Sequence, residues 1–149
     1  MHILRIPIDD APILLSLSGI GDATLRARIG SMFGWTPVEV KHMINNGGLN
    51  LQKINDALKS MIVSGHGDPD VIASGYLFVL ISSTLFPDKS GNAGMYKMMH
   101  VLLNHDYTNS LAWGVAVLAY LYRQLGMTSR RDAKQIGGCL LLLHVSNFL

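Results

Sequence analysis

A series of helix start and stop signals runs through the sequence and constrains its fold more than any other feature. Residues 36–39 read Thr-Pro-Val-Glu, which places a capping hydroxyl, a proline at the first helical position and the glutamate of a capping box in order. Asn50 and Asp68 are further side chains of the type that cap helix N-termini. Gly34 and Gly126 supply stops, because glycine adopts the left-handed conformation that ends many helices. The chain is therefore expected to fold into helices separated by short breaks.

These signals predict an all-α fold of about seven helices in a single domain that spans residues 1–149. The expected helices cover residues 23–33, 37–46, 51–63, 69–86, 95–104, 111–125 and 133–145. Asp22 is expected to cap the first of them and Ser110 the sixth. No segment combines period-two alternation with an enrichment in β-branched residues, so no sheet is expected. The sequence also holds no internal repeat and no long linker, which favours one unit.

The last two long helices are expected to be central, because each is apolar on more than one face. A helix that is apolar all round is normally buried on all sides. We therefore expect the two to pack against each other in the middle of the domain. The first of these helices carries two apolar stripes. One stripe consists of Leu111, Val115, Leu118, Tyr122 and Leu125, and the other consists of Trp113, Val117 and Leu121.

The composition is unusually apolar for a soluble domain. Hydrophobic residues make up 49% of the chain and charged residues 15%, whereas about 25% is usual for the charged class. A membrane protein, a large partner interface or a missing part of the domain would each explain this. The apolar stretches at 71–86, 111–122 and 136–149 are shorter than the roughly 18 to 20 residues that span a bilayer. Charges at Arg5, Asp9 and Asp10 interrupt the start, so neither a membrane helix nor a signal peptide is expected.

Two segments of the sequence resemble the plant mobile domain, the module of MAIN-like (maintenance-of-meristems) proteins and of certain plant transposable elements. They read STLFPDKSGN at residues 83–92 and LAWGVAVLAYLYRQL at 111–125, the latter continuing as SRRDAKQIGGCLLLL at 129–143. The clear resemblance covers about 71–143, and residues 1–67 resemble the family's preceding helices more loosely. Members of the family continue with a tryptophan-rich segment, whereas this chain stops at Leu149. We therefore expect a domain truncated at its C-terminus, which would account for its apolar composition.

The resemblance implies an all-helical module of the kind labelled aminotransferase-like. It implies localisation in the nucleus and roles in transposon silencing, genome maintenance and meristem development. It also implies a protein partner, with a protein phosphatase 7-like protein as a candidate.

The residues themselves indicate no enzyme, no cofactor and no metal site. A pyridoxal-phosphate enzyme needs a Schiff-base lysine beside a phosphate cup, and none of the six lysines lies in a glycine-rich pocket. The loop at 90–97 lacks the adjacent glycine and lysine of a phosphate loop. His100 and His105 are five residues apart, so they lie on different helix faces and make a poor metal pair. Cys139, the single cysteine, is expected to be a small buried side chain with an unreactive thiol.

A basic helix junction is the one candidate contact site in the sequence. Cations in the first turn of a helix are unfavourable to its dipole, which raises the question of what favours them there. Nucleic-acid phosphate is one open answer, and an acidic surface on a partner or on the missing C-terminal part of the domain is another. A solvated junction, with Asp132 offsetting the charge, is also open. The four residues are Arg123, Arg130, Arg131 and Lys134.

The leading interpretation is a non-enzymatic nuclear interaction module with a protein partner, because a net charge of +2 gives little long-range attraction for nucleic acid. The first alternative is a transposon-derived, nucleic-acid-associated module that uses the basic junction. The second is an inert or neofunctionalised truncated fragment.

Overall fold

The computed structural model describes residues 21–45, 48–88, 92–129 and 136–146. These ranges hold eight helices and three short strands, so the predicted all-α class is confirmed. In chain order the elements are α2 (Asp22–Phe33), α3 (Pro37–Met43), β1 (Ile44–Asn45), β2 (Gly48–Asn50), α4 (Leu51–Ser64), α5 (Pro69–Thr84), β3 (Ala93–Met95), α6 (Tyr96–Leu102), α7 (His105–Asn109), α8 (Trp113–Thr128) and α9 (Leu140–Ser146).

Three of the predicted helix starts are confirmed by their hydrogen bonds. At α3 the Glu39 N–H donates to Thr36 Oγ1 at 3.3 Å and the Thr36 N–H donates to the Glu39 carboxylate at 2.6 Å, which completes the capping box. Asn50 Oδ1 accepts from the Lys53 N–H at 3.0 Å where α4 begins. Asp68 accepts from the Asp70 N–H, also at 3.0 Å, where α5 begins. Side-chain caps therefore fix the starts of three consecutive helices.

Two of the predicted caps are wrong. Gly21 occupies the cap position of α2 without a side-chain bond, and the Asp22 carboxylate instead accepts from Arg26 Nε at 2.9 Å one turn along the helix. Ser110 instead follows α7, a short helix that the sequence analysis did not expect, and its hydroxyl donates to the Tyr107 carbonyl. Because of this extra helix, the described residues hold eight helices, one more than the predicted count of about seven.

The small antiparallel sheet, in the order β1-β2-β3, corrects the expectation that no sheet forms. Its strands are two or three residues long, too short for an alternating pattern to show in the sequence. Leu49 in the middle strand is fully buried. Gly94 in β3 lies against α5, where an added Cβ would stand 2.5 Å from Ser82 Oγ and 2.6 Å from Phe78 Cζ. Only glycine allows β3 to approach the helix this closely.

The hydrophobic core is built around α5, which packs against α4, α6 and β3. Phe78 on α5 is fully buried, and Gly75 meets Leu58 of α4 so closely that an added Cβ would lie 2.6 Å from its side chain. The buried apolar residues of this core are Leu25, Ile29, Val40, Ile44, Leu49, Leu51, Ile54, Leu58, Phe78, Ile81, Tyr96, Met98, Met99, Val101, Leu102 and Leu111.

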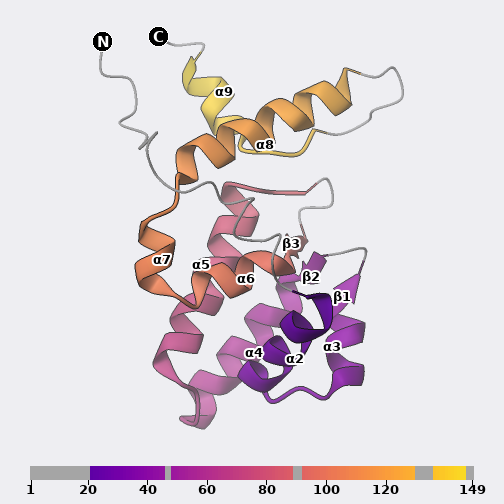
Figure 1. Ribbon diagram of the computed structural model, residues 1–149, viewed down its shortest axis with the longest axis vertical. Coiled ribbons are helices and arrows are strands. Elements are labelled where there is room, and N and C mark those ends of the chain that lie inside the picture. Colours follow the sequence, from indigo (N-terminus) through magenta and orange to yellow (C-terminus); the bar gives the residue numbers. More distant parts are fainter. Residues whose placement is uncertain (1–20, 46–47, 89–91, 130–135, 147–149) are drawn as a thin grey trace.

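The predicted central position of the last two helices is wrong. Figure 1 shows α8 (orange) and α9 (yellow) at one end of the fold, while α2, α3 and α4 lie at the other. Helix α8 has three buried residues, Val117, Leu121 and Gln124. Helix α9 begins at Leu140, because residues 136–139 are not helical; the expected start at 133 lies outside the described residues. An apolar composition on every side indicates that a helix is covered by other apolar groups. It does not show whether these groups belong to the same chain or to another molecule.

Candidate interaction surface

Of the four residues of the basic junction, one, Arg123, lies in the described part of the chain. Arg123 lies on α8 with its side chain exposed, and it makes no ion pair within the described part of the chain, where the recorded pair joins Arg26 to Asp22. Arg130, Arg131 and Lys134 lie outside the described residues. The gathering of all four cations at one site therefore stays a prediction.

The carbonyl of Pro87 holds the C-terminal part of the described chain against the end of α5. It accepts hydrogen bonds from the Gly138 N–H at 3.0 Å and from the Tyr120 hydroxyl at 3.2 Å. Burial raises the pKa of Tyr120, and the nearby charge of Asp88 raises it further, so the phenol stays a donor at neutral pH. Gly138 has a φ of 104°, which other residues rarely adopt. Two bonds to one oxygen thus fix α8 and residues 137–139 in place.

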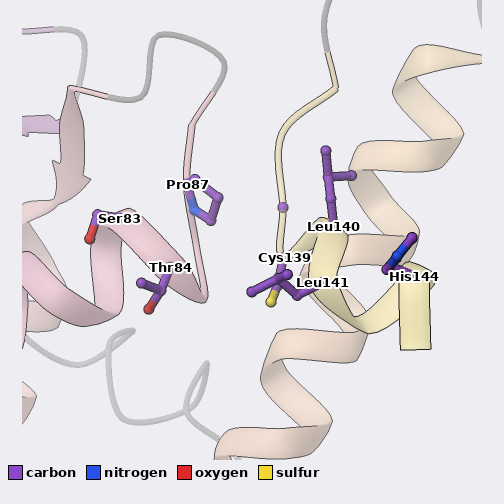
Figure 2. A pocket seen from close by; sticks show the side chains of 8 residues that line it. Ser83, Thr84, Pro87, Cys139, Leu140, Leu141 and His144 are labelled. Atoms are coloured by element: carbon purple, nitrogen blue, oxygen red, sulfur yellow. The ribbon is translucent and has the colours of Figure 1, made fainter. Parts of the chain in front are cut away.

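This arrangement leaves a hollow of about 490 Å³ between the end of α5 and α9. Figure 2 shows Ser83, Thr84 and Pro87 on one side of it and Leu140, Leu141 and His144 on the other. The hydroxyls of Ser83 and Thr84 both donate to the Leu80 carbonyl of their own helix, at 3.1 and 2.6 Å. The hollow therefore presents mainly aliphatic surface. The described residues that line it are Ser83, Thr84, Pro87, Gly138, Cys139, Leu140, Leu141 and His144.

The predicted burial of Cys139 is confirmed, since the residue is 7% exposed at the edge of this hollow. Its two neighbours along α9 are exposed instead, Leu140 at 47% and Leu141 at 71%. Aliphatic side chains that are this open beside a hollow are suited to binding another apolar side chain.

A serine–histidine contact that the sequence analysis missed lies in the middle of the fold. Ser74 Oγ stands 3.1 Å from His105 Nε2 and donates to the Leu102 carbonyl, also at 3.1 Å. Because the hydroxyl hydrogen points to the carbonyl, the imidazole N–H donates to Oγ, which is the reverse of a base activating a nucleophile. Ser74 is also 1% exposed, so no substrate reaches it. The contact joins α5 to α6 and α7, and 31 residues of separation gave no local signal for it.

The two histidines that were weighed as metal ligands face different helices. Arg28 of α2 donates to His100 Nδ1 at 3.0 Å, whereas His105 faces Ser74 of α5. Partial burial, and then the charge of Arg28, lower the pKa of His100, so its imidazole is a neutral acceptor at neutral pH. Within the described ranges no group of three histidine, cysteine or carboxylate side chains could hold a metal ion.

Helix α8 presents an apolar face on the side opposite its three buried residues. Val115, Ala119, Tyr122 and Gly126 are exposed and follow one another at spacings of four, three and four, which places them in one row along the helix; we call this row the α8 seam. Val115 is 44% exposed and Tyr122 is 70% exposed. A Cβ added at Gly126 would meet no atom of the described residues within 4 Å. Within the described part of the chain the seam is therefore uncovered along its length.

None of the helices in the described part of the chain is both long enough and apolar enough to cross a bilayer. At this end of the fold the described residues form two apolar surfaces, the α8 seam and the hollow beside α9.

Comparison with known proteins identifies the relatives of this chain. The plant mobile domain family matches residues 4–148. The protein MAIN-LIKE 1 of Arabidopsis thaliana is 30% identical over 144 residues, which are 95% of this chain and 28% of that protein. The Arabidopsis thaliana protein MAINTENANCE OF MERISTEMS is 37% identical over 68 residues, 46% of this chain and 14% of that protein.

A third relative has an enzyme's name. The serine/threonine-protein phosphatase 7 long form homolog of Arabidopsis thaliana is 34% identical over 83 residues, 52% of this chain and 6% of that protein. The chain thus spans less than a third of the length of each of these relatives. No solved structure matches it.

Proposed function

The chain belongs to the plant mobile domain family, and from that premise we propose that it is a non-enzymatic interaction module of the nucleus. In this role it binds a protein partner and supports transposon silencing, genome maintenance and meristem development. The relative named MAINTENANCE OF MERISTEMS supports the developmental part of the proposal.

The observation that carries the proposal is the open apolar surface of α8 and α9. Four large apolar side chains of these two helices are exposed at one end of the fold, outside the core around α5. Exposing such side chains to water costs free energy that a bound partner would recover. They are Val115, Tyr122, Leu140 and Leu141.

The chemistry of the described side chains supports a binding role over catalysis. The serine nearest to a histidine is buried and oriented as an acceptor of the imidazole proton. The hollow beside α9 presents leucines, and its two serine and threonine hydroxyls are already bonded to their own helix. Such a surface can hold an apolar side chain of a partner.

A protein phosphatase 7-like protein is the partner that we propose. The phosphatase 7 long form homolog shares 34% identity with this chain over 83 residues, so a related segment occurs in a protein with a phosphatase name.

A direct binding measurement tests this function. The full chain is titrated into the Arabidopsis thaliana phosphatase 7 long form homolog by isothermal calorimetry, and a fluorescent fusion of the chain is imaged in plant cells. We expect saturable binding and a nuclear signal. Binding to DNA or RNA instead, with an affinity that falls steeply as salt rises, would favour the nucleic-acid alternative at the basic junction.

A further inference from the structure

The α8 seam has the geometry of a helix–helix contact. Residues at alternating spacings of four and three form the stripe through which one helix packs along another. The seam alternates two larger side chains, Val115 and Tyr122, with two small residues, Ala119 and Gly126. Small residues leave holes into which the side chains of a second helix can fit. The α8 seam is therefore shaped to pack against a second helix.

The size of the seam favours one helix over a second copy of the whole domain. Tyr122 is 70% exposed, and since an aromatic side chain spans about 150–250 Å², it contributes roughly 140 Å² to the seam. With Val115 at 44% exposed, these two side chains offer an area on the order of 200 Å². A stable dimer buries about 800 Å² on each partner. One helix laid along the 16 residues of α8, about 24 Å, matches the smaller area.

The charge beside the seam indicates the chemistry of that helix. Arg123 is the one charged residue of α8, it is exposed at the edge of the seam, and it makes no ion pair within the described residues. A second α8 would bring no carboxylate to it, because this helix contains neither aspartate nor glutamate. A partner helix that carries a carboxylate next to its own apolar stripe would cover the α8 seam and pair with Arg123.

From these features we propose that the α8 seam binds an amphipathic helix of a partner protein, with leucine-like side chains between Val115 and Tyr122 and a glutamate or aspartate facing Arg123. This rests on the proposed interaction function and names the surface and the partner chemistry. The apolar contacts supply the affinity, and the ion pair sets the direction and register of the bound helix.

Three synthetic 21-residue helical peptides test the proposal. They share leucines at the four–three spacing and differ at the flanking positions, which are glutamate, glutamine or lysine. Each is titrated against the full chain by fluorescence anisotropy at low salt. We expect the glutamate peptide to bind at least about threefold more tightly than the lysine peptide. Arg123→Glu should invert this order, because it exchanges attraction for repulsion.

Substitutions within the seam separate the apolar contact from the charge. Ala119→Gln and Gly126→Gln place a bulky polar side chain without charge in the row, and we expect each to weaken all three peptides by at least about tenfold. A Cβ added at Gly126 would meet no atom of the described residues within 4 Å, so the second variant keeps the test valid if the first one folds poorly. Lys59→Glu is the matched charge control for Arg123→Glu, because Lys59 is exposed on α4, and Figure 1 shows α4 at the opposite end of the fold from α8.

Equal binding of the three peptides by the parent chain, or undiminished binding by both seam variants, would overturn the proposal. So would a dimer of the chain that Ala119→Gln dissociates, because the occupant would then be a second copy. If the parent and both seam variants bind the phosphatase equally well, the interaction function stands and the seam is not its site. If the parent fails to bind the phosphatase but discriminates among the peptides, the seam stands and that partner is wrong.

Discussion

Replacing Gly94 with alanine tests the packing of β3 on α5, the closest approach in the core. The new Cβ would lie 2.5 Å from Ser82 Oγ, 2.6 Å from Phe78 Cζ and 2.9 Å from Ser82 Cβ. The serine hydroxyl can rotate away, but Ser82 Cβ is fixed to the helix backbone and Phe78 is fully buried. The strand must therefore move, and overpacking of this kind costs about 1–3 kcal/mol. At about 2–4 °C per kcal/mol, we expect the melting temperature to fall by roughly 2–12 °C.

Gly126→Ala is the matched control, since it is the same chemical change on the open face of α8. A Cβ there would meet no atom of the described residues within 4 Å, and alanine in a helix is more stable than glycine by about 0.5–1 kcal/mol. Thermal unfolding followed by circular dichroism should therefore move in opposite directions for the two variants. A Gly94→Ala protein that melts at or above the parent temperature would refute the packing described here, and a destabilised Gly126→Ala protein would show that α8 is covered.

Further outcomes follow from the core, the buried contact, the histidine and the lysines. Phe78→Ala should lower the free energy of unfolding by about 3–5 kcal/mol in urea titrations, since it empties the centre of the core; a loss below about 1 kcal/mol would place the core elsewhere. Ser74→Ala should cost about 1–3 kcal/mol and leave any trace esterase reading unchanged, and a reading that disappeared with the serine would contradict its structural role. The pKa of His100 is lowered in the folded state, so its contribution to stability is present above its ordinary pKa and is lost as the pH falls. His100→Gln should therefore flatten the decline in melting temperature on acidification, and an unchanged decline would count against that contact. Pyridoxal phosphate should form no lysine aldimine detectable by mass spectrometry, because no phosphate cup accompanies the lysines.

Local signals in the sequence were sufficient to predict most helix starts. The capping box at Thr36 and the caps at Asn50 and Asp68 involve residues two or three positions apart, so the pattern that makes the bond is visible in the sequence. Asp22 fails as a cap for an equally local reason. Arg26 stands one turn later, and the ion pair between them uses the carboxylate that a cap would need.

Features that depend on distant residues could not be predicted in this way. The strand pairing of Leu49 with Gly94 joins segments 45 positions apart, and short strands carry no periodicity of their own. The contact of Ser74 with His105 likewise exists only after α5 and α7 are brought together. The candidate interaction surface could be predicted from the sequence only in part. The sequence showed that α8 is apolar on more than one face and placed Val115 and Tyr122 in one stripe, but it did not identify the α8 seam. The exposure of the seam follows from a core that assembles around α5 instead.

Hydrogen–deuterium exchange of the full chain, with and without the Arabidopsis thaliana phosphatase 7 long form homolog, tests the central claim most directly. The account predicts that binding slows amide exchange in Trp113–Thr128 and Leu140–Ser146 and leaves Asp22–Phe33 and Leu51–Ser64 unchanged. Protection confined to the α2–α4 end of the fold, or exchange that the phosphatase does not alter at saturating concentration, would contradict it.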